Sequence, residues 1–187
     1  MIPGTHLLIA RIAYEHVLKK TNVKLDYQAF AYGNIKPDLD KSCINCWHTF
    51  EDSVNIINAY AEELVESKVS VKEFSEALGM ICHFVCDYFC LHHGREYWKK
   101  DPIAHGIYEV KLHVRFLKLY KNGNIKISYK CKPEKSLKEI VDKFRRKYNS
   151  KPIGITKDIV YSLVAAISVC DFIVCSSKYN IAAANIS

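Results

Sequence analysis

The sequence is poor in the residues that mark fibrous and low-complexity chains, with 7 Gly and 5 Pro in 187 residues. This scarcity excludes collagen-like and repetitive linker proteins. Charged residues make up 25% of the chain and hydrophobic residues 49%, a balance that excludes a disordered protein. A chain of this length is about the size of one domain and can bury a core of its own. We therefore predict a single domain over residues 1–187.

We expect the protein to have no leader, and the chain has no long uninterrupted apolar run. Residues 1–6 have neither the basic nor the apolar region of a secretory signal. The longest apolar stretch, Ile159–Cys175, includes Asp171 and is short for a membrane span, so a buried helix fits it better. We therefore expect a cytoplasmic protein with no transmembrane segment, in which thiols stay reduced.

Cysteine, in contrast, is abundant, with 8 residues in the chain. In a reducing compartment these residues are interpreted as small buried hydrophobic groups or metal ligands rather than as disulfides. Cys43 and Cys46 form one Cys-x-x-Cys pair, which we interpret as chance or as a minor redox pair. Cys82, Cys86 and Cys90 recur at every fourth position, which indicates a packing stripe of small residues on one helix.

The net charge of +7 is a local feature of the second half of the chain. Residues 1–93 carry a net charge of −4, whereas residues 111–151 alone carry +11. A local basic field suits an anionic partner such as lipid headgroups, nucleic acid or a phosphorylated small molecule. The simplest alternative is a solvated helix face and a loop. We expect this segment to make peripheral contact with an anionic membrane surface.

Helical periodicity dominates the chain, and we predict an all-α bundle of roughly six helices in one domain. Residues 31–42 are rich in turn formers, and residues 125–131 alternate as a short strand or an extended loop would. The predicted helices are His6–Lys20, Thr49 to about Glu66, Val71–His93, Ile103 to about Tyr120, Ser136–Lys147 and Thr156–Ser176.

Two of the predicted helices each carry a histidine followed four residues later by a carboxylate. His83 and Asp87 share one helix face, and His105 and Glu109 repeat the arrangement in the next helix. One such pair is commonly a surface contact, but two in successive helices indicate a metal cluster between helices. Asp87 lies in a strongly apolar stretch, where a buried carboxylate needs a compensating cation. His93, six residues later, is near enough to join this cluster.

The order of these motifs resembles the bacterial zinc-dependent phospholipase C family and the related zinc-dependent single-strand nucleases. The resemblance covers residues 5–109, and it implies an all-helical fold around a cluster of three zinc ions. The motifs that carry it are Thr5-His6-Leu7, Gly33-Asn34-Ile35-Lys36-Pro37-Asp38, His48, His83-xxx-Asp87-xxxxx-His93 and His105-xxx-Glu109.

This resemblance implies eight ligand side chains and two or three Zn²⁺ ions as cofactor. It also implies that Asp38 is the general base, or the group that orients the attacking water. The implied ligands are His48, His83 and Asp87 with Asp38 beside them for one ion, His93, His105 and Glu109 for a second, and His6 with Asp87 for a third.

Three details of this ligand set stay open. Secreted members use an amino-terminal tryptophan as a ligand, whereas here Met1 precedes His6 by five residues. The third site therefore uses the Met1 terminus, uses another ligand or does not exist. His92 is an alternative to His93 as the ligand, and His113 belongs either beside the cluster or to the basic surface.

The resemblance implies a zinc-dependent phosphodiester hydrolase of the phospholipase C type, in which metal-activated water attacks phosphorus in line. A phospholipid is the expected substrate. One alternative is a single-strand-type nuclease, for which the basic segment would contact the phosphates of nucleic acid. The other is a non-catalytic zinc-binding module that retains the ligands.

Overall fold

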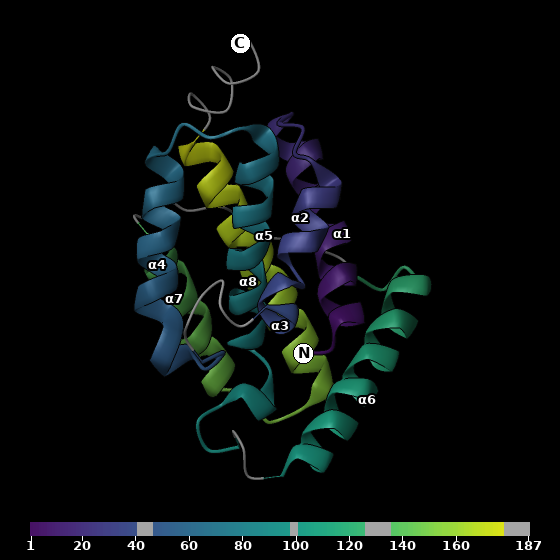
Figure 1. The fold of residues 1–187 in the computed structure, drawn as a ribbon. Helices are drawn as coiled ribbons and strands as arrows, with labels where there is room; N and C mark the ends of the chain where they lie inside the picture. Colours follow the sequence, from purple (N-terminus) through teal and green to yellow (C-terminus); the bar gives the residue numbers. More distant parts are fainter. Residues whose placement is uncertain (41–46, 98–100, 126–135, 178–187) are drawn as a thin grey trace.

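The structure, a computed structural model, describes residues 1–40, 47–97, 101–125 and 136–177. This part of the chain contains eight α-helices, one 3₁₀ turn and no strand, so the all-α prediction is confirmed (Figure 1). Residues 43, 46 and 126–131 lie outside the described residues. The helices are α1 (Pro3–Thr21), α2 (Tyr27–Gly33), α3 (Lys36–Leu39), α4 (Phe50–Glu66), α5 (Val71–Asp87), α6 (Pro102–Lys121), α7 (Leu137–Asn149) and α8 (Ile155–Ser176), with the turn η1 at Leu91–His93.

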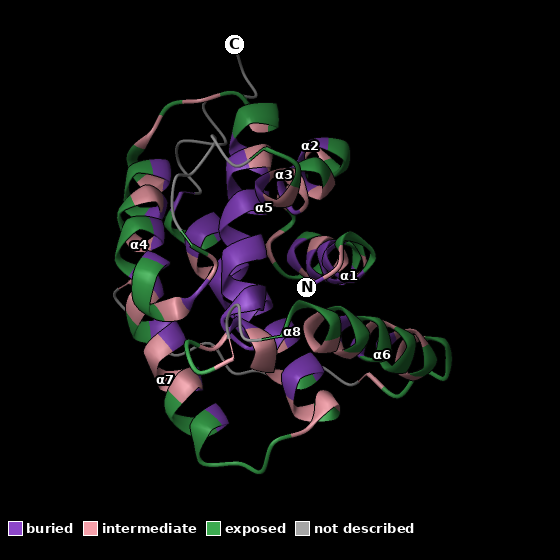
Figure 2. Ribbon diagram, turned by 60° about the horizontal axis from the view of Figure 1, so that its bottom comes forward, coloured by how far each residue is buried: buried purple, intermediate pink, exposed green. Residues whose placement is uncertain are grey.

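Helices α5 and α8 form the centre of the bundle, and the other helices surround them (Figure 2). Helix α5 begins with a capping box, in which Ser70 and Glu73 satisfy each other's backbone N–H groups. Its residues from Phe74 to Asp87 are almost all buried, because neighbours pack on every side. A helix that is apolar on all faces is suited to this central position.

Helix α8 is long and apolar enough, by length and composition, to cross a membrane. In this fold, however, 67% of its most apolar window is buried against the rest of the protein. Its main neighbours are α5, α1 and α7, and residues such as Ile167 and Val169 are fully enclosed. This packing agrees with the sequence prediction of a buried helix at these residues.

The segment predicted as turn-rich, residues 31–42, contains the end of α2 and all of α3. Both helices are short and escape detection by periodicity, but their boundaries have local causes. Asp26 caps α2 by accepting a hydrogen bond from the Ala29 N–H, and Asn34 follows its last turn. Pro37 lies in the first turn of α3, where a missing N–H costs nothing.

The prediction of one continuous helix over Val71–His93 is wrong. Helix α5 ends at Asp87, and Cys90 adopts an extended backbone (φ −99°, ψ 125°) before the η1 turn. The cause lies far away in sequence, because the buried Asp158 carboxylate of α8 accepts a hydrogen bond from the Leu91 N–H at 2.8 Å. The break turns His93 back toward Asp87.

Helices α2 and α5 approach each other so closely that glycine is required on both. A Cβ atom on Gly33 would overlap the Glu76 carbonyl oxygen, and one on Gly79 would overlap the Phe30 carbonyl oxygen. Only hydrogen at these positions permits the contact. This contact places Asn34 beside α5, where its carbonyl oxygen meets His83 in the second half of the helix.

Candidate metal centre

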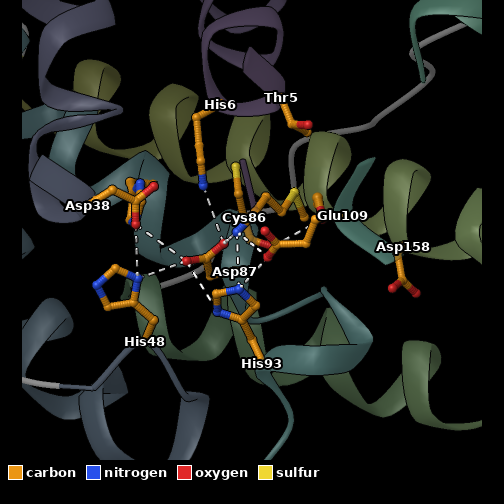
Figure 3. Close-up of polar contacts among 12 residues, drawn as sticks. Thr5, His6, Asp38, His48, Cys86, Asp87, His93, Glu109 and Asp158 are labelled. Atoms are coloured by element: carbon orange, nitrogen blue, oxygen red, sulfur yellow. Dashed lines mark hydrogen bonds and ion pairs between the residues drawn. The ribbon is translucent and has the colours of Figure 1, made fainter. Parts of the chain in front are cut away.

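Asp87 is the focus of a buried cluster of nitrogen and oxygen donors (Figure 3). Figure 3 shows Asp38 and His48 on one side of its carboxylate and Glu109 on the other. Five nitrogen atoms surround the two oxygens. Oδ1 lies 2.6 Å from the Met1 α-amino nitrogen and 3.4 Å from His6 Nε2, and Oδ2 lies 3.0 Å from His48 Nδ1, 3.4 Å from His83 Nε2 and 3.3 Å from His93 Nδ1.

The orientation of His83 is fixed by the backbone of α2. Its Nδ1–H donates to the Asn34 carbonyl oxygen at 2.9 Å, since a carbonyl can only accept. This hydrogen bond leaves the Nε2 lone pair facing the cluster, 3.1 Å from His48 Nδ1. A histidine held in this way by a carbonyl oxygen is typical of a metal ligand.

Asp38 projects from α3 toward the same two histidines. Its Oδ1 lies 3.7 Å from His83 Nε2 and 3.8 Å from His48 Nδ1, and the side chain is 27% exposed. Burial and the nearby charge of Asp87 raise the pKa of Asp38 above its ordinary value. The carboxylate is therefore more basic than a solvated aspartate and lies at the exposed edge of the cluster.

Glu109 of α6 is surrounded by a second set of nitrogen atoms. Its Oε1 lies 2.8 Å from His105 Nε2, 3.0 Å from His93 Nε2 and 3.1 Å from the Met1 nitrogen. Burial alone would raise the pKa of Glu109, but hydrogen bonds from His105 and His93 hold it well below its ordinary range. Glu109 is therefore a carboxylate, as a metal ligand must be.

Burial and neighbouring charges set the protonation states at the centre. Burial opposes the charge on Asp87, but His93, the α-amino group and the other histidines hold its pKa well below the ordinary value. Burial likewise lowers the pKa of His83, and lowers that of His93 to about 4, so both imidazoles are neutral near pH 7. Neutral imidazoles and ionised carboxylates are the protonation states that bind metal.

His6 gives the clearest indication that a cation belongs here. Its side chain is fully buried, and within the described residues neither ring nitrogen has a hydrogen-bond partner. A buried polar group without a partner costs free energy, which is of order 1–3 kcal/mol. Metal coordination by Nε2 would remove that cost. The donor set of imidazole nitrogens and carboxylate oxygens is the set that Zn²⁺ prefers.

All eight side chains predicted as ligands lie in this cluster or touch it. Among the described residues, four sets of three donors are close enough to hold a metal ion, with ligand atoms within 4.8 Å of one another. The sets are His6, His83 and Asp87; Asp38, His48 and His83; His48, Asp87 and His93; and Cys90, His93 and Glu109. His105 joins through Glu109 Oε1. Their roles as ligands remain predictions.

Cys90 is a donor that sequence reasoning missed. The every-fourth-residue pattern indicated a packing stripe, but the helix ends before Cys90, so its thiol turns toward His93 and Glu109. The only sequence signal was its position between the Asp87 and His93 motif residues. The role of the Asn34 carbonyl oxygen in orienting His83 was missed as well, because every residue has a backbone carbonyl and the sequence cannot indicate which one accepts this hydrogen bond.

The two open alternatives also have definite places. His93, not His92, lies in the cluster, while the His92 ring packs 4.8 Å from the ring centroid of Tyr108. His113 Nδ1 is hydrogen-bonded to Thr5 Oγ1 at 3.1 Å, next to His6 in the chain. His113 thus fixes the first turn of α1 rather than belonging only to the basic surface.

The buried carboxylate of Asp158 lies outside the cluster and holds together segments that carry its side chains. Asp158 accepts hydrogen bonds from the hydroxyls of Tyr108 (2.7 Å) and Tyr148 (2.8 Å) in addition to the Leu91 N–H. Tyr108 precedes Glu109, and Leu91 begins the turn that carries His93. Asp158 therefore ties α6, α7 and the η1 turn together, and it fixes two parts of the centre at once.

Together, the fold and the cluster define an all-helical protein whose donor groups could hold metal between helices. The family described as zinc dependent phospholipase C matches residues 5–155, so the chain belongs to the zinc-dependent phospholipase C family. No curated protein matches the chain, and no solved structure does. The family resemblance seen in the sequence is thereby confirmed.

Proposed function

We propose that the chain is a zinc-dependent phosphodiester hydrolase of the phospholipase C type. The observation that carries the proposal is the position of Asp87, which belongs to two different sets of metal-binding side chains. A carboxylate in that position can bridge two metal ions, and paired ions are suited to in-line displacement at phosphorus. Family membership supports the same class of reaction.

Bound zinc supplies Lewis-acid stabilisation of charge on phosphoryl oxygens and lowers the pKa of a water molecule to about 7. His48, His83 and Asp87 would hold one ion, and His93, Glu109 and His105 a second. His6 and Asp87 offer ligand atoms for a third, and the α-amino group, an ammonium paired with Asp87, would join them only after losing a proton. Burial raises the pKa of the Cys90 thiol, so Cys90 would add a softer ligand to the second set only as the thiolate.

Asp38 is the group we assign to proton transfer. It lies at the edge of the cluster with a raised pKa, which suits a carboxylate that must take a proton from the attacking water. As the water oxygen bonds to phosphorus, the P–O bond to glycerol breaks, and the departing alkoxide takes up a proton from solvent while the proton on Asp38 returns to solvent. With a phospholipid, the products would be a diacylglycerol and a phosphorylated headgroup.

Purified protein should release phosphorylated headgroup from a soluble short-chain phosphatidylcholine. Dialysis against a chelator should abolish this release, and added Zn²⁺ should restore it, because the donors hold the metal that activates water. The amount of phosphocholine released measures both the loss and the recovery of activity. Cleavage of single-stranded DNA without any phospholipid hydrolysis would instead indicate the nuclease. Full zinc content without turnover of either substrate would indicate the non-catalytic zinc-binding module.

Replacing Asp38 with asparagine should lower kcat by about 10²–10⁴-fold, the usual contribution of a general base. Zinc content should fall little, since His48, His83 and Asp87 remain. Metal analysis and phosphocholine release on the same sample separate the effect on zinc content from the effect on kcat. A D38N variant with wild-type kcat would exclude this residue as the base.

A further inference from the structure

The outward face of α6 carries an apolar stripe that the fold does not use. Ile103, Ile107, Val110 and Val114 are 76%, 50%, 53% and 60% exposed. Their spacing of four, three and four residues places them on one side of the helix. An exposed, contiguous row of branched apolar side chains on a protein of this size indicates an interaction surface.

The opposite face of the same helix packs against the bundle. Leu112 and Phe116 are fully buried against the bundle, and Glu109 points into the metal centre. In Figure 2, α6 lies at the edge of the molecule beside α1, with much of its surface exposed. The stripe is therefore a second apolar face, additional to the one that anchors the helix.

Positive charge borders this stripe. Lys111, Arg115 and Lys118 are exposed and follow one flank of the stripe along the helix. Between Pro102 and Lys121 the only acidic residue is Glu109, which is buried. An apolar stripe with cationic and no anionic neighbours on its own helix is the pattern of a helix that lies on an anionic lipid surface.

We propose that the outer face of α6 docks onto an anionic phospholipid bilayer, an inference that rests on the proposed function for its biological purpose. The four apolar side chains would enter the boundary between headgroups and acyl chains. Lys111, Arg115 and Lys118 would meet the phosphates. A second copy of the chain is a poorer occupant, because two such faces would bring together like charges with no acidic partners on α6.

Docking in this way would bring the metal centre to its substrate. His105 and Glu109 project from the other side of α6, so the centre would lie about one helix diameter, roughly 10 Å, from the bilayer surface. The docking helix thus also carries two of the metal-ligand candidates. Of the basic segment predicted to contact the membrane, residues 111–151, the proposal uses only residues 111–118, and it adds residues 103–110 of the same helix.

The test is co-sedimentation with vesicles of phosphatidylcholine alone or with phosphatidylserine added. Wild-type protein should bind the anionic vesicles in a salt-dependent manner. The double variant Ile107→Ser/Val114→Ser should bind them about tenfold more weakly or worse, because it removes two of the inserting side chains. The matched control is Ile153→Ser/Val160→Ser, whose side chains are 65% and 48% exposed and lie outside α6.

A second variant, Lys111→Gln/Arg115→Gln, separates charge from insertion. It should lose roughly fivefold in affinity for each charge removed, and only on anionic vesicles. Failure of the wild type to bind anionic vesicles, or equal losses in the I107S/V114S and control pairs, would overturn the proposal. So would a wild-type dimer that I107S/V114S converts to a monomer, since the stripe would then be a self-interface.

The failure of docking is distinguishable from the failure of the proposed function. The I107S/V114S protein should hydrolyse a soluble short-chain phospholipid at the wild-type rate, because neither side chain belongs to the metal centre. Vesicle binding without any hydrolysis would support the docking surface and contradict the proposed reaction. Hydrolysis of the soluble substrate without vesicle binding would support the proposed reaction and contradict the docking surface.

Discussion

Replacing Asp87 with asparagine should remove the metal centre. The carboxylate contacts the Met1 nitrogen and four histidines, and it is shared by two sets of donors. An amide supplies one weak oxygen donor and no charge, so zinc affinity should fall by at least about 100-fold, beyond the 10–100-fold cost of losing an outer contact. Hydrolysis should fall in parallel. Metal content after dialysis and phosphocholine release from short-chain phosphatidylcholine are the measurements.

The matched control is Asp171→Asn. Asp171 is equally buried and is also paired, with Lys20 Nζ at 2.6 Å and His16 Nε2 at 3.1 Å. His16 is ten residues beyond His6 on α1, about 15 Å along the helix. This variant should lose stability while it keeps its zinc. A D87N protein that retains full zinc, or a D171N protein that loses as much, would contradict the assignment.

The second large effect is expected at the contact of α2 with α5. Gly79→Ala should destabilise the protein by about 3 kcal/mol or more, at the upper end of overpacking costs, because the new methyl group meets the rigid Phe30 carbonyl rather than a movable side chain. Urea denaturation measures the change. Zinc affinity should fall too, since a displaced α2 carries away the Asn34 carbonyl that orients His83.

Gly106→Ala is the control for this substitution. Gly106 is exposed in the middle of α6, and nothing lies within 4 Å of the position that its Cβ would occupy. Alanine there should stabilise the helix by about 0.5–1 kcal/mol, the ordinary preference over glycine. If G79A and G106A change the free energy of unfolding alike, close approach is not the reason for glycine at position 79.

The parts of the centre that the sequence predicts well are those fixed within a single helix. His83 with Asp87, and His105 with Glu109, share a face because helical geometry alone sets that distance. The same holds for most helix boundaries, such as the stop of α6 at Asn122 and Gly123, where glycine has φ 65°. Local rules suffice when the cause is local.

The parts that were missed or wrong have causes remote in the sequence. The break after Asp87 depends on Asp158, and only the break turns Cys90 into the cluster. Helices α2 and α3 are too short for periodicity to reveal, and the position of α2 on α5 depends on the close approach at Gly33. The predicted cytoplasmic location and single-domain organisation stay predictions.

The assembly of the centre from scattered segments has a thermodynamic consequence. Its candidate metal ligands come from helices α1, α3, α5 and α6, from the η1 turn, and from His48, which precedes α4. These side chains are neighbours only in the folded chain. A metal ion that binds the native form alone adds about 2.7 kcal/mol to the free energy of unfolding at 100 times its Kd, and about 4.1 kcal/mol at 1,000 times. Free zinc in the cell would thus act as a component of the folding equilibrium, setting the abundance of this protein together with its activity.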